Sequence, residues 1–399
     1  MTLQHVTVTL KTVSPLFMGG IDPWGAPELR PASIRGVLRW WLRALAGARV
    51  AGGRPVTLTD VHRAEATVFG ETDSASSIIV RVQEGTTGPP KPKHDFTRQE
   101  RNALNYLWYG LHQRQGRGKD LQIRYRPLFP PGESFKIRLQ VRPTRYDRSQ
   151  SFEEACRALW LLMTLGGLGA RSRRGSGILV VNELEGEWPA NVPQPYQGEA
   201  NSPRALVSLL TQGLHDLHGA RMEKYPNPLP YANLRPDRYT LVVFDKVWND
   251  WESALTELGE AFRDFRSRHQ PDYDTVKNFI LSGRAAQTVE RAAFGLPLPF
   301  YYRSLNGGKA TVEGDGYDRS ASPLHFRLWP LQDGKKMAAG FLLFKSPLLP
   351  PREGRLLLRR SGGTTTVSVP SQRAILAFLS ELETPNSEFH IAPMLAVGP

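Results

Sequence analysis

The chain contains 399 residues, and its 51 Lys and Arg residues outnumber its 38 Asp and Glu residues, which gives a formal net charge of +13 and a pI near 9.9. This length allows two domains of ordinary size, and an apolar content of 40% suits a globular core. No run of about 18 apolar residues is found, which excludes a membrane span. Cys156 is the only cysteine, which excludes a disulfide framework and a cysteine-based metal site. Since no signal-peptide pattern is found either, the sequence favours a cytoplasmic protein.

The positive charge comes mainly from arginine and is concentrated in the first half of the chain. Arginine supplies 39 of the 51 basic residues, and residues 1–200 contain 27 basic but only 18 acidic residues. Arginine is favoured for forked contacts with phosphate and for stacking on aromatic rings. We therefore expect a polyanionic partner that binds chiefly to the first half.

The first half of the chain predicts strands and helices in the order β-α-β-β-α-β. Alternation of apolar and polar residues predicts strands over 5–13 and 134–142, and apolar residues at helical spacing predict helices over 34–46 and 152–165. The remaining candidates are strands at 77–82 and 178–181 and a short helix at 98–111. This order is the ferredoxin-like plan, which RNA-recognition domains share.

The strand predicted over 134–142 has an apolar face that turns to the core and a basic face that turns to solvent, here called its dry and wet faces. Its wet side chains include Lys136 and Arg138, which we expect to contact RNA. Trp24, in the loop before the first helix, is another candidate contact, because an aromatic ring that stacks on a base contributes about 1–3 kcal/mol. The alternative is that the Trp24 ring closes the core beneath its loop.

Basic residues form a stripe along the helix predicted over 34–46. The stripe consists of Arg35, Arg39 and Arg43, with Arg30 just ahead of it. Residues 29–59 contain six arginines and no acid. Like charges at a spacing of four destabilise a helix by roughly a few tenths of a kcal/mol per pair. We therefore expect an outside anion to offset this repulsion, which makes these arginines candidate RNA contacts, and the alternative is that they pair with acids elsewhere in the fold.

The segment 167–177 combines glycine with positive charge. Gly167 and Gly169 allow tight turns and a close approach to bare N–H groups. The guanidinium groups of the segment belong to Arg171, Arg173 and Arg174. The combination predicts a phosphate-binding loop, and a solvated turn is the alternative. The loop is not a Walker A motif, since no Gly-Lys-Ser or Gly-Lys-Thr closes it.

The second half repeats the pattern less regularly. Residues 184–206 indicate a boundary, which predicts domains over 1–200 and 201–399, with a helix at 201–219 that fits either side. The elements expected beyond it are strands at 239–244, 323–328, 337–344, 355–358 and 365–369, and helices at 251–266, 275–293 and 371–382. The sequence thus predicts an α+β protein with tandem ferredoxin-like (RRM-like) domains, antiparallel sheets and insertions.

Several stretches resemble a known family. Residues 14–20 and 28–41 are similar to the opening of the RAMP proteins of CRISPR systems, and 167–177 is similar to their glycine-rich loop. Residues 291–297 and 319–324 resemble the first subunit of the type III-B (Cmr) effector complex. The resemblance implies a non-catalytic subunit that holds single-stranded target RNA near the 3′ end of the guide RNA. It also implies that both RNAs and the other subunits are partners.

We expect no catalytic residue, no cofactor and no metal, but two alternatives remain open. The first is a metal-dependent endoribonuclease that uses Asp22, because the resemblance implies RNA cleavage by an acid in a comparable loop of the backbone subunits. His5 or His62 could serve as a general base in a metal-independent form. The second alternative is a protein scaffold that touches RNA little. His215 and His218 lack the further ligands that a metal site needs.

Overall fold

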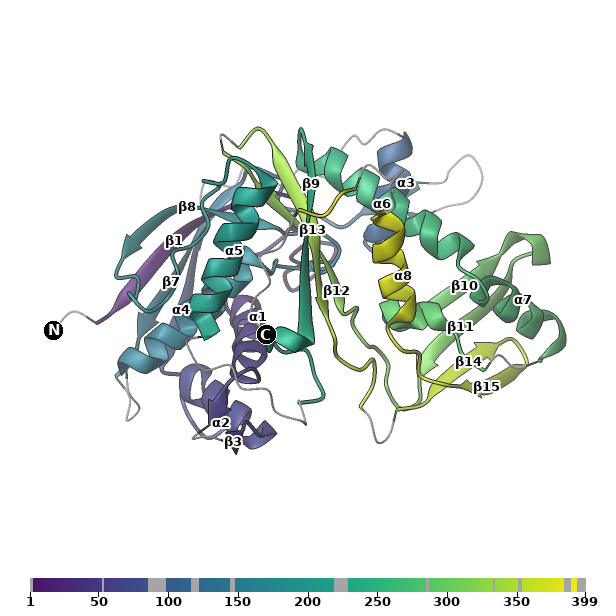
Figure 1. The fold of residues 1–399 in the computed structure, drawn as a ribbon, viewed down its shortest axis with the longest axis horizontal. Coiled ribbons are helices and arrows are strands. Elements are labelled where there is room, and N and C mark those ends of the chain that lie inside the picture. Colours follow the sequence, from purple (N-terminus) through teal and green to yellow (C-terminus); the bar gives the residue numbers. More distant parts are fainter. Residues whose placement is uncertain are drawn as a thin grey trace.

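The structure is a computed structural model, and it describes residues 3–51, 54–84, 98–115, 122–143, 148–218, 229–284, 287–332, 334–350, 354–383 and 389–392. Figure 1 shows two α+β units side by side, with the first unit on the left and an accessory sheet of the second unit on the far right. None of the helices in these ranges combines the length and the apolar content needed to cross a bilayer.

The first unit is a four-stranded antiparallel sheet with two helices on one face. Its strands lie in the order β4-β7-β1-β8, with bounds Ile78–Glu84, Ser134–Val141, His5–Thr12 and Leu179–Gly186. The two helices are α1 (Pro31–Ala46) and α4 (Arg148–Thr164). Together with the chain order β1-α1-β4-β7-α4-β8, this is the ferredoxin-like topology that the sequence predicts.

Alternating side chains join this sheet to its helices. On β7, Phe135, Ile137 and Leu139 are buried, and the residues between them are only half-buried. On α1, Leu38 and Trp41 are buried against the same core. The dry and wet faces predicted for this strand are therefore confirmed. A short hairpin follows α1 and consists of β2 (Val50–Ala51) and β3 (Arg54–Pro55).

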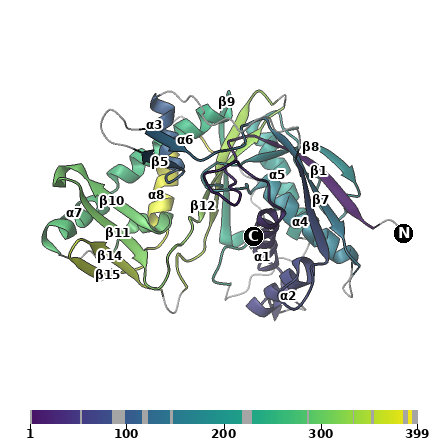
Figure 2. The ribbon, with the colours of Figure 1, turned by 180° about the vertical axis from the view of Figure 1, so that it is seen from behind.

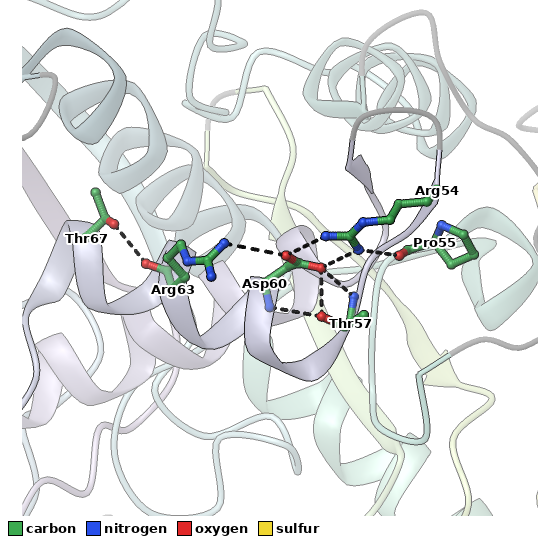
Figure 3. Close-up of polar contacts among 6 residues, drawn as sticks. All are labelled: Arg54, Pro55, Thr57, Asp60, Arg63 and Thr67. Carbon is green, nitrogen blue, oxygen red and sulfur yellow. Dashed lines mark hydrogen bonds and ion pairs between the residues drawn. The ribbon is translucent and has the colours of Figure 1, made fainter.

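Helix α2 (Leu58–Phe69) is capped by its own side chains. The Asp60 backbone N–H donates to Thr57 Oγ1 at 3.2 Å, and the Thr57 N–H donates to Asp60 Oδ2 at 2.9 Å. Both terminal nitrogens of Arg54 donate to the same carboxylate, at 2.7 and 3.0 Å, and Arg63 lies on its other side (Figure 3). The bond from Arg54, followed by those from Thr57, holds the pKa of Asp60 well below its usual range.

We expect that replacing Thr57 by Ala lowers the free energy of unfolding by about 1 kcal/mol, since the change removes half of a capping box. Denaturant unfolding of the full chain measures this loss. Thr67→Ala is the matched control, because Thr67 lies in the same helix and its hydroxyl only donates to the Arg63 carbonyl at 2.8 Å. Equal losses in the two variants would contradict the capping role of Thr57.

An insertion between β4 and β7 reaches the second unit. Its elements are α3 (Arg98–Leu107), β5 (His112–Gln115) and β6 (Gln122–Tyr125). Both views show α3 beside α6 (Trp251–Arg268) of the second unit and away from the first sheet (Figures 1 and 2). A Cβ on Gly259 of α6 would lie only 3.1 Å from Leu107 Cδ1, so a small residue permits this contact.

The second unit repeats the topology with a shortened last strand. Its sheet has the order β12-β13-β9, with bounds Leu324–Pro330, Met337–Phe344 and Tyr239–Trp248. Helices α6 and α8 (Arg373–Leu382) pack on one face. Residues 389–392 take the place of a fourth strand, because the Ala392 N–H donates to the Val243 carbonyl at 2.8 Å. The fold is therefore α+β with tandem ferredoxin-like units, as expected.

A four-stranded accessory sheet has its own core at the far end of the second unit. Its order is β10-β11-β14-β15, with bounds Leu298–Tyr302, Gly308–Gly314, Leu356–Arg360 and Gly363–Val367. The strands predicted at 355–358 and 365–369 belong to this sheet. Helix α7 (Asp272–Ser282) packs on it.

The helix predicted over 275–293 was wrong beyond Ser282. Gly283 has a left-handed φ of +74° and ends α7 by donating its N–H to the Phe279 carbonyl at 2.9 Å. Short 3-10 helices occupy Pro236–Arg238, Glu290–Phe294 and Arg303–Leu305. The end of the predicted helix is therefore a separate short turn.

The sheet of the second unit is enclosed on both faces. Every residue of β12 and β13 is buried, and four of their side chains, Trp329, Ala338, Leu342 and Phe344, join the core of the first unit. Trp40 of α1 contacts Phe344, with ring centroids 5.6 Å apart. Helix α5 (Pro203–His218) packs on Trp160 of α4 and on β9. The domain boundary near residue 200 stays a prediction.

Candidate nucleic-acid interface

The glycine-rich segment 167–177 packs against the loop that follows β1. The Ala170 N–H donates to the Phe17 carbonyl at 2.7 Å. Gly169 has a φ of +78°, and a Cβ there would lie 2.4 Å from the same carbonyl oxygen. Gly167 is buried. The close approach predicted for these two glycines is therefore made by the protein's own backbone and not by phosphate.

Arg173 and Arg174 point into the junction between the two units. Arg173 donates to the Ser322 carbonyl at 2.9 Å, and Arg174 donates to the Phe294 carbonyl at 3.1 Å. The guanidinium of Arg174 also lies over the ring of Phe262, with 4.5 Å between its Cζ and the ring centroid. Donors of both arginines thus face carbonyl groups and rings of the second unit, and contacts of Arg173 and Arg174 with phosphate stay a prediction.

These partly buried charges have no carboxylate partner within the described residues. Burial lowers the pKa of Arg174 to about 9 and that of Arg173 to about 10. Arg327 of β12 is also buried and donates to the Thr164 carbonyl, the last of α4, at 2.9 Å. Aromatic faces and the negative end of a helix dipole both stabilise a cation. The three arginines therefore join the two units.

The arginine stripe of α1 is largely paired within the fold. Arg39 Nη1 donates to Glu65 Oε1 at 2.7 Å, and Arg43 Nη1 donates to Glu65 Oε2 at 2.8 Å. An acid of α2 therefore pairs with both arginines, as in the alternative stated above, and its side chain is only 11% exposed. RNA contacts of Arg39 and Arg43 stay a prediction. Arg35 forms no ion pair with any described residue, and its Nε is buried without a hydrogen-bond partner.

The uncovered face of the first sheet carries charge but, among its described residues, no Phe, Tyr or Trp. Lys136 donates to Glu185 at 2.6 Å, and Arg138 stands opposite Arg81 on the neighbouring strand. The other described side chains that the strand register places on this face include His5, Thr7, Thr9, Gln83, Gln140 and Glu183. RNA-recognition domains stack bases on sheet aromatics, and this face lacks such a platform. RNA contacts of Lys136 and Arg138 stay a prediction.

Three other guanidinium groups lie close together at the surface where the units meet. They belong to Arg126, Arg171 and Arg319, here called the arginine cluster, and none of them pairs with a carboxylate in the part of the chain that the structure describes. Arg171 has a left-handed φ of +61° and donates to the Tyr109 carbonyl. Partial withdrawal from water lowers the pKa of Arg171, and the positive charges of Arg319 and Arg126 lower it further. Since like charges repel, the cluster favours a bound anion.

A pocket of about 280 Å³ opens beside the arginine cluster. Its walls come from the loop after β1, the first turns of α1, residues 126–127 and the start of the glycine-rich segment. The ring of Trp24 follows the lining residue Pro23 and stacks with Arg126, with 5.2 Å between Arg126 Cζ and the ring centroid. A flat surface and positive charge therefore meet at this pocket.

The structure brings together only part of the predicted site. Trp24, Arg171 and Arg30, the exposed residue that precedes the first turn of α1, lie near the pocket. Sequence reasoning missed Arg126 and Arg319. Arg126 lies in no motif, and the stretch that begins at Arg319 resembles the family without indicating a role for this side chain.

The candidate catalytic residues have structural partners. Asp22 Oδ1 accepts the Trp24 N–H at 2.9 Å, so Asp22 caps its own turn. His62 Nε2 lies 3.8 Å from Glu71 Oε2, and burial lowers the pKa of His218 to about 4. Across the described ranges, no group of three or more His, Cys, Asp or Glu residues is placed to hold a metal ion.

The sequence is similar to known proteins of CRISPR systems. It matches the model of the RAMP superfamily over residues 9–180. It is 33% identical over 189 residues to the CRISPR system Cmr subunit Cmr1-2 of Pyrococcus furiosus, and the match covers 44% of this chain and 94% of the relative. Its identity to Cmr subunit Cmr1-1 of the same organism is 28% over 255 residues, covering 63% of this chain and 69% of the relative.

Two solved structures share the fold. The crystal structure of Cmr1 from Pyrococcus furiosus in its apo form has a TM-score of 0.57 and 19% identity, covering 94% of this chain and 96% of that chain. A chain in the cryo-EM structure of the type III-B Cmr-beta bound to cognate target RNA has a TM-score of 0.54 and 14% identity, covering 95% and 99%. These likenesses support the overall fold of the chain.

Proposed function

Since the chain belongs to the Cmr1 family of the RAMP superfamily, we propose that it is a non-catalytic, RNA-binding subunit of a type III-B (Cmr) RNA-guided effector complex. In this role it captures single-stranded target RNA near the 3′ end of the guide RNA. Its partners are both RNAs and the other subunits of the complex, and its location is the cytoplasm. The target RNA in the Cmr-beta structure supports this proposal.

The arginine cluster is the observation that carries the proposal. A single-stranded RNA offers a row of phosphates, and guanidinium groups without carboxylate partners are suited to bind them. Arg126 and Arg171 come from the first unit and Arg319 comes from the second, so a bound strand lies across the seam between the units. The ring of Trp24, stacked with Arg126, adds a surface for a base.

We expect that replacing the arginine cluster by Gln at all three positions weakens binding of the full chain to single-stranded RNA. The slope of log affinity against log salt should become shallower by about 2, since each phosphate contact on a single strand contributes about 0.7. Filter binding at several salt concentrations measures both quantities. The matched control replaces three exposed arginines elsewhere, Arg63, Arg204 and Arg359, by Gln, and has the same net charge.

Wild-type affinity and salt slope in the cluster variant would contradict the RNA-binding role of the arginine cluster.

The non-catalytic part of the proposal has its own test. Purified protein is incubated with labelled RNA and Mg²⁺ or Mn²⁺, and we expect the RNA to stay intact. Cleavage that disappears on Asp22→Asn would establish the endoribonuclease instead.

A further inference from the structure

The pocket beside the arginine cluster has room for one planar group and little more. Its volume of about 280 Å³ lies at the lower end of the range for small-molecule pockets. Its lining residues are Phe17, Met18, Gly19, Pro23, Ser33, Val37, Arg126, Pro127, Gly169 and Ala170. A duplex or a folded RNA cannot enter a space of this size, whereas a single base can.

The lining of the pocket combines apolar residues with a free hydroxyl. Phe17, Met18 and Val37 supply apolar surface, and Phe17 is fixed edge-on against Trp108 with ring centroids 5.4 Å apart. The hydroxyl of Ser33 makes no hydrogen bond with any described residue, so it is available to a ligand. A nucleobase has apolar faces and hydrogen-bonding edges, and this lining suits both.

Positive charge stands at the mouth of the pocket. Arg126 is itself a lining residue, and Arg171 directly follows the lining residue Ala170. The neighbouring loop also carries an acid, Asp22, whose Oδ1 accepts a hydrogen bond from the Trp24 N–H at 2.9 Å. A free phosphate would use the charges and leave the apolar walls uncovered, whereas a nucleotide uses both features.

We propose that this pocket receives one unstacked nucleobase of a single-stranded RNA, while the phosphates on either side of that nucleotide lie on the arginine cluster. The inference rests on the proposed function, since it names the part of the RNA that this surface binds. It predicts that affinity depends on the bases as well as on the phosphates, without requiring a particular sequence.

The test compares a single-stranded RNA oligomer with an abasic ribose-phosphate oligomer of the same length, both binding to the full chain. We expect wild-type protein to bind the RNA about tenfold more tightly, because stacking one base contributes about 1–3 kcal/mol. Ser33→Leu, which places three more carbon atoms at the pocket, should lose this preference and keep the salt slope. Gly36→Leu is the matched control, since a Cβ at Gly36 meets no atom within 4 Å, and it should behave as wild type.

Equal wild-type affinities for the two oligomers, with a steep salt dependence for both, would overturn the base pocket and leave the proposed function intact. Absence of binding to either oligomer would overturn the proposed function as well. A preference that Ser33→Leu retains would place the base on another surface and overturn the pocket. The wild-type comparison needs no variant, so equal affinities for the two oligomers overturn the pocket even where Ser33→Leu does not fold.

Discussion

Arg174→Ala is expected to lower the free energy of unfolding by about 3 kcal/mol, because it removes a half-buried side chain packed between rings and leaves a buried carbonyl without its donor. The guanidinium of Arg174 lies 4.5 Å from the ring centroid of Phe262 and 5.4 Å from that of Phe326, and it donates to the Phe294 carbonyl. Truncation opens a void between these rings. Chemical denaturation of the full chain measures the loss.

Two companion variants separate packing from charge. Arg174→Met keeps the aliphatic stem and removes a charge that has no acid partner, so it should cost less than about 1 kcal/mol. Arg171→Ala, at the surface three residues earlier, should cost less than about 0.5 kcal/mol but weaken RNA binding. Wild-type stability in Arg174→Ala, together with weaker RNA binding, would mean that Arg174 contacts phosphate after all.

Gly169→Ala is expected to lower the free energy of unfolding by about 3 kcal/mol and also to weaken RNA binding. At a positive φ, a residue with a Cβ lowers the free energy of unfolding by roughly 1–2 kcal/mol relative to glycine. Here the Cβ would also lie 2.4 Å from the Phe17 carbonyl oxygen. The loop that carries Phe17 has to move, and this loop forms one wall of the pocket. Thermal unfolding and RNA binding on the same preparation measure the two effects.

Gly316→Ala is the control for Gly169→Ala. Gly316 has a similar φ of +72°, but a Cβ there meets no atom within 4 Å. It therefore isolates the cost of the backbone conformation from the cost of the collision. A loss at Gly169 no larger than the loss at Gly316 would show that the loop yields easily and that the tight approach to Phe17 is not required.

The ferredoxin-like topology could be predicted because its main strands carry complete periodic patterns. On β7 every second residue is apolar over the whole strand, and on α1 the apolar residues recur at helical spacing. Residues 389–392, which take the place of the last strand of the second unit, escaped prediction because a stretch of four residues is too short to show a period. Strand β10 also escaped, since Leu298–Tyr302 contains a proline and two adjacent tyrosines, and these residue types do not reveal the alternation of buried and exposed side chains that the strand has in the fold.

The candidate site could be predicted less well because its chemistry depends on partners that are distant in the sequence. Local pattern correctly placed positive charge on α1, but the acid that pairs with Arg39 and Arg43 lies 26 and 22 residues away. Arg174 is enclosed by rings from the second unit, which no pattern around residue 174 indicates. Charge can be read from a sequence, whereas the side on which a guanidinium emerges is decided by packing.

The enclosed sheet of the second unit leaves the described part of the molecule without a hinge at the seam. Side chains of β12 and β13 belong to the cores of both units, so the units cannot swing apart without exposing them to water. The distance between Arg171 and Arg319 is therefore fixed during folding and not by the ligand. A preorganised surface of this kind loses little conformational entropy on association, and RNA would dock on it at a rate governed by encounter rather than by rearrangement.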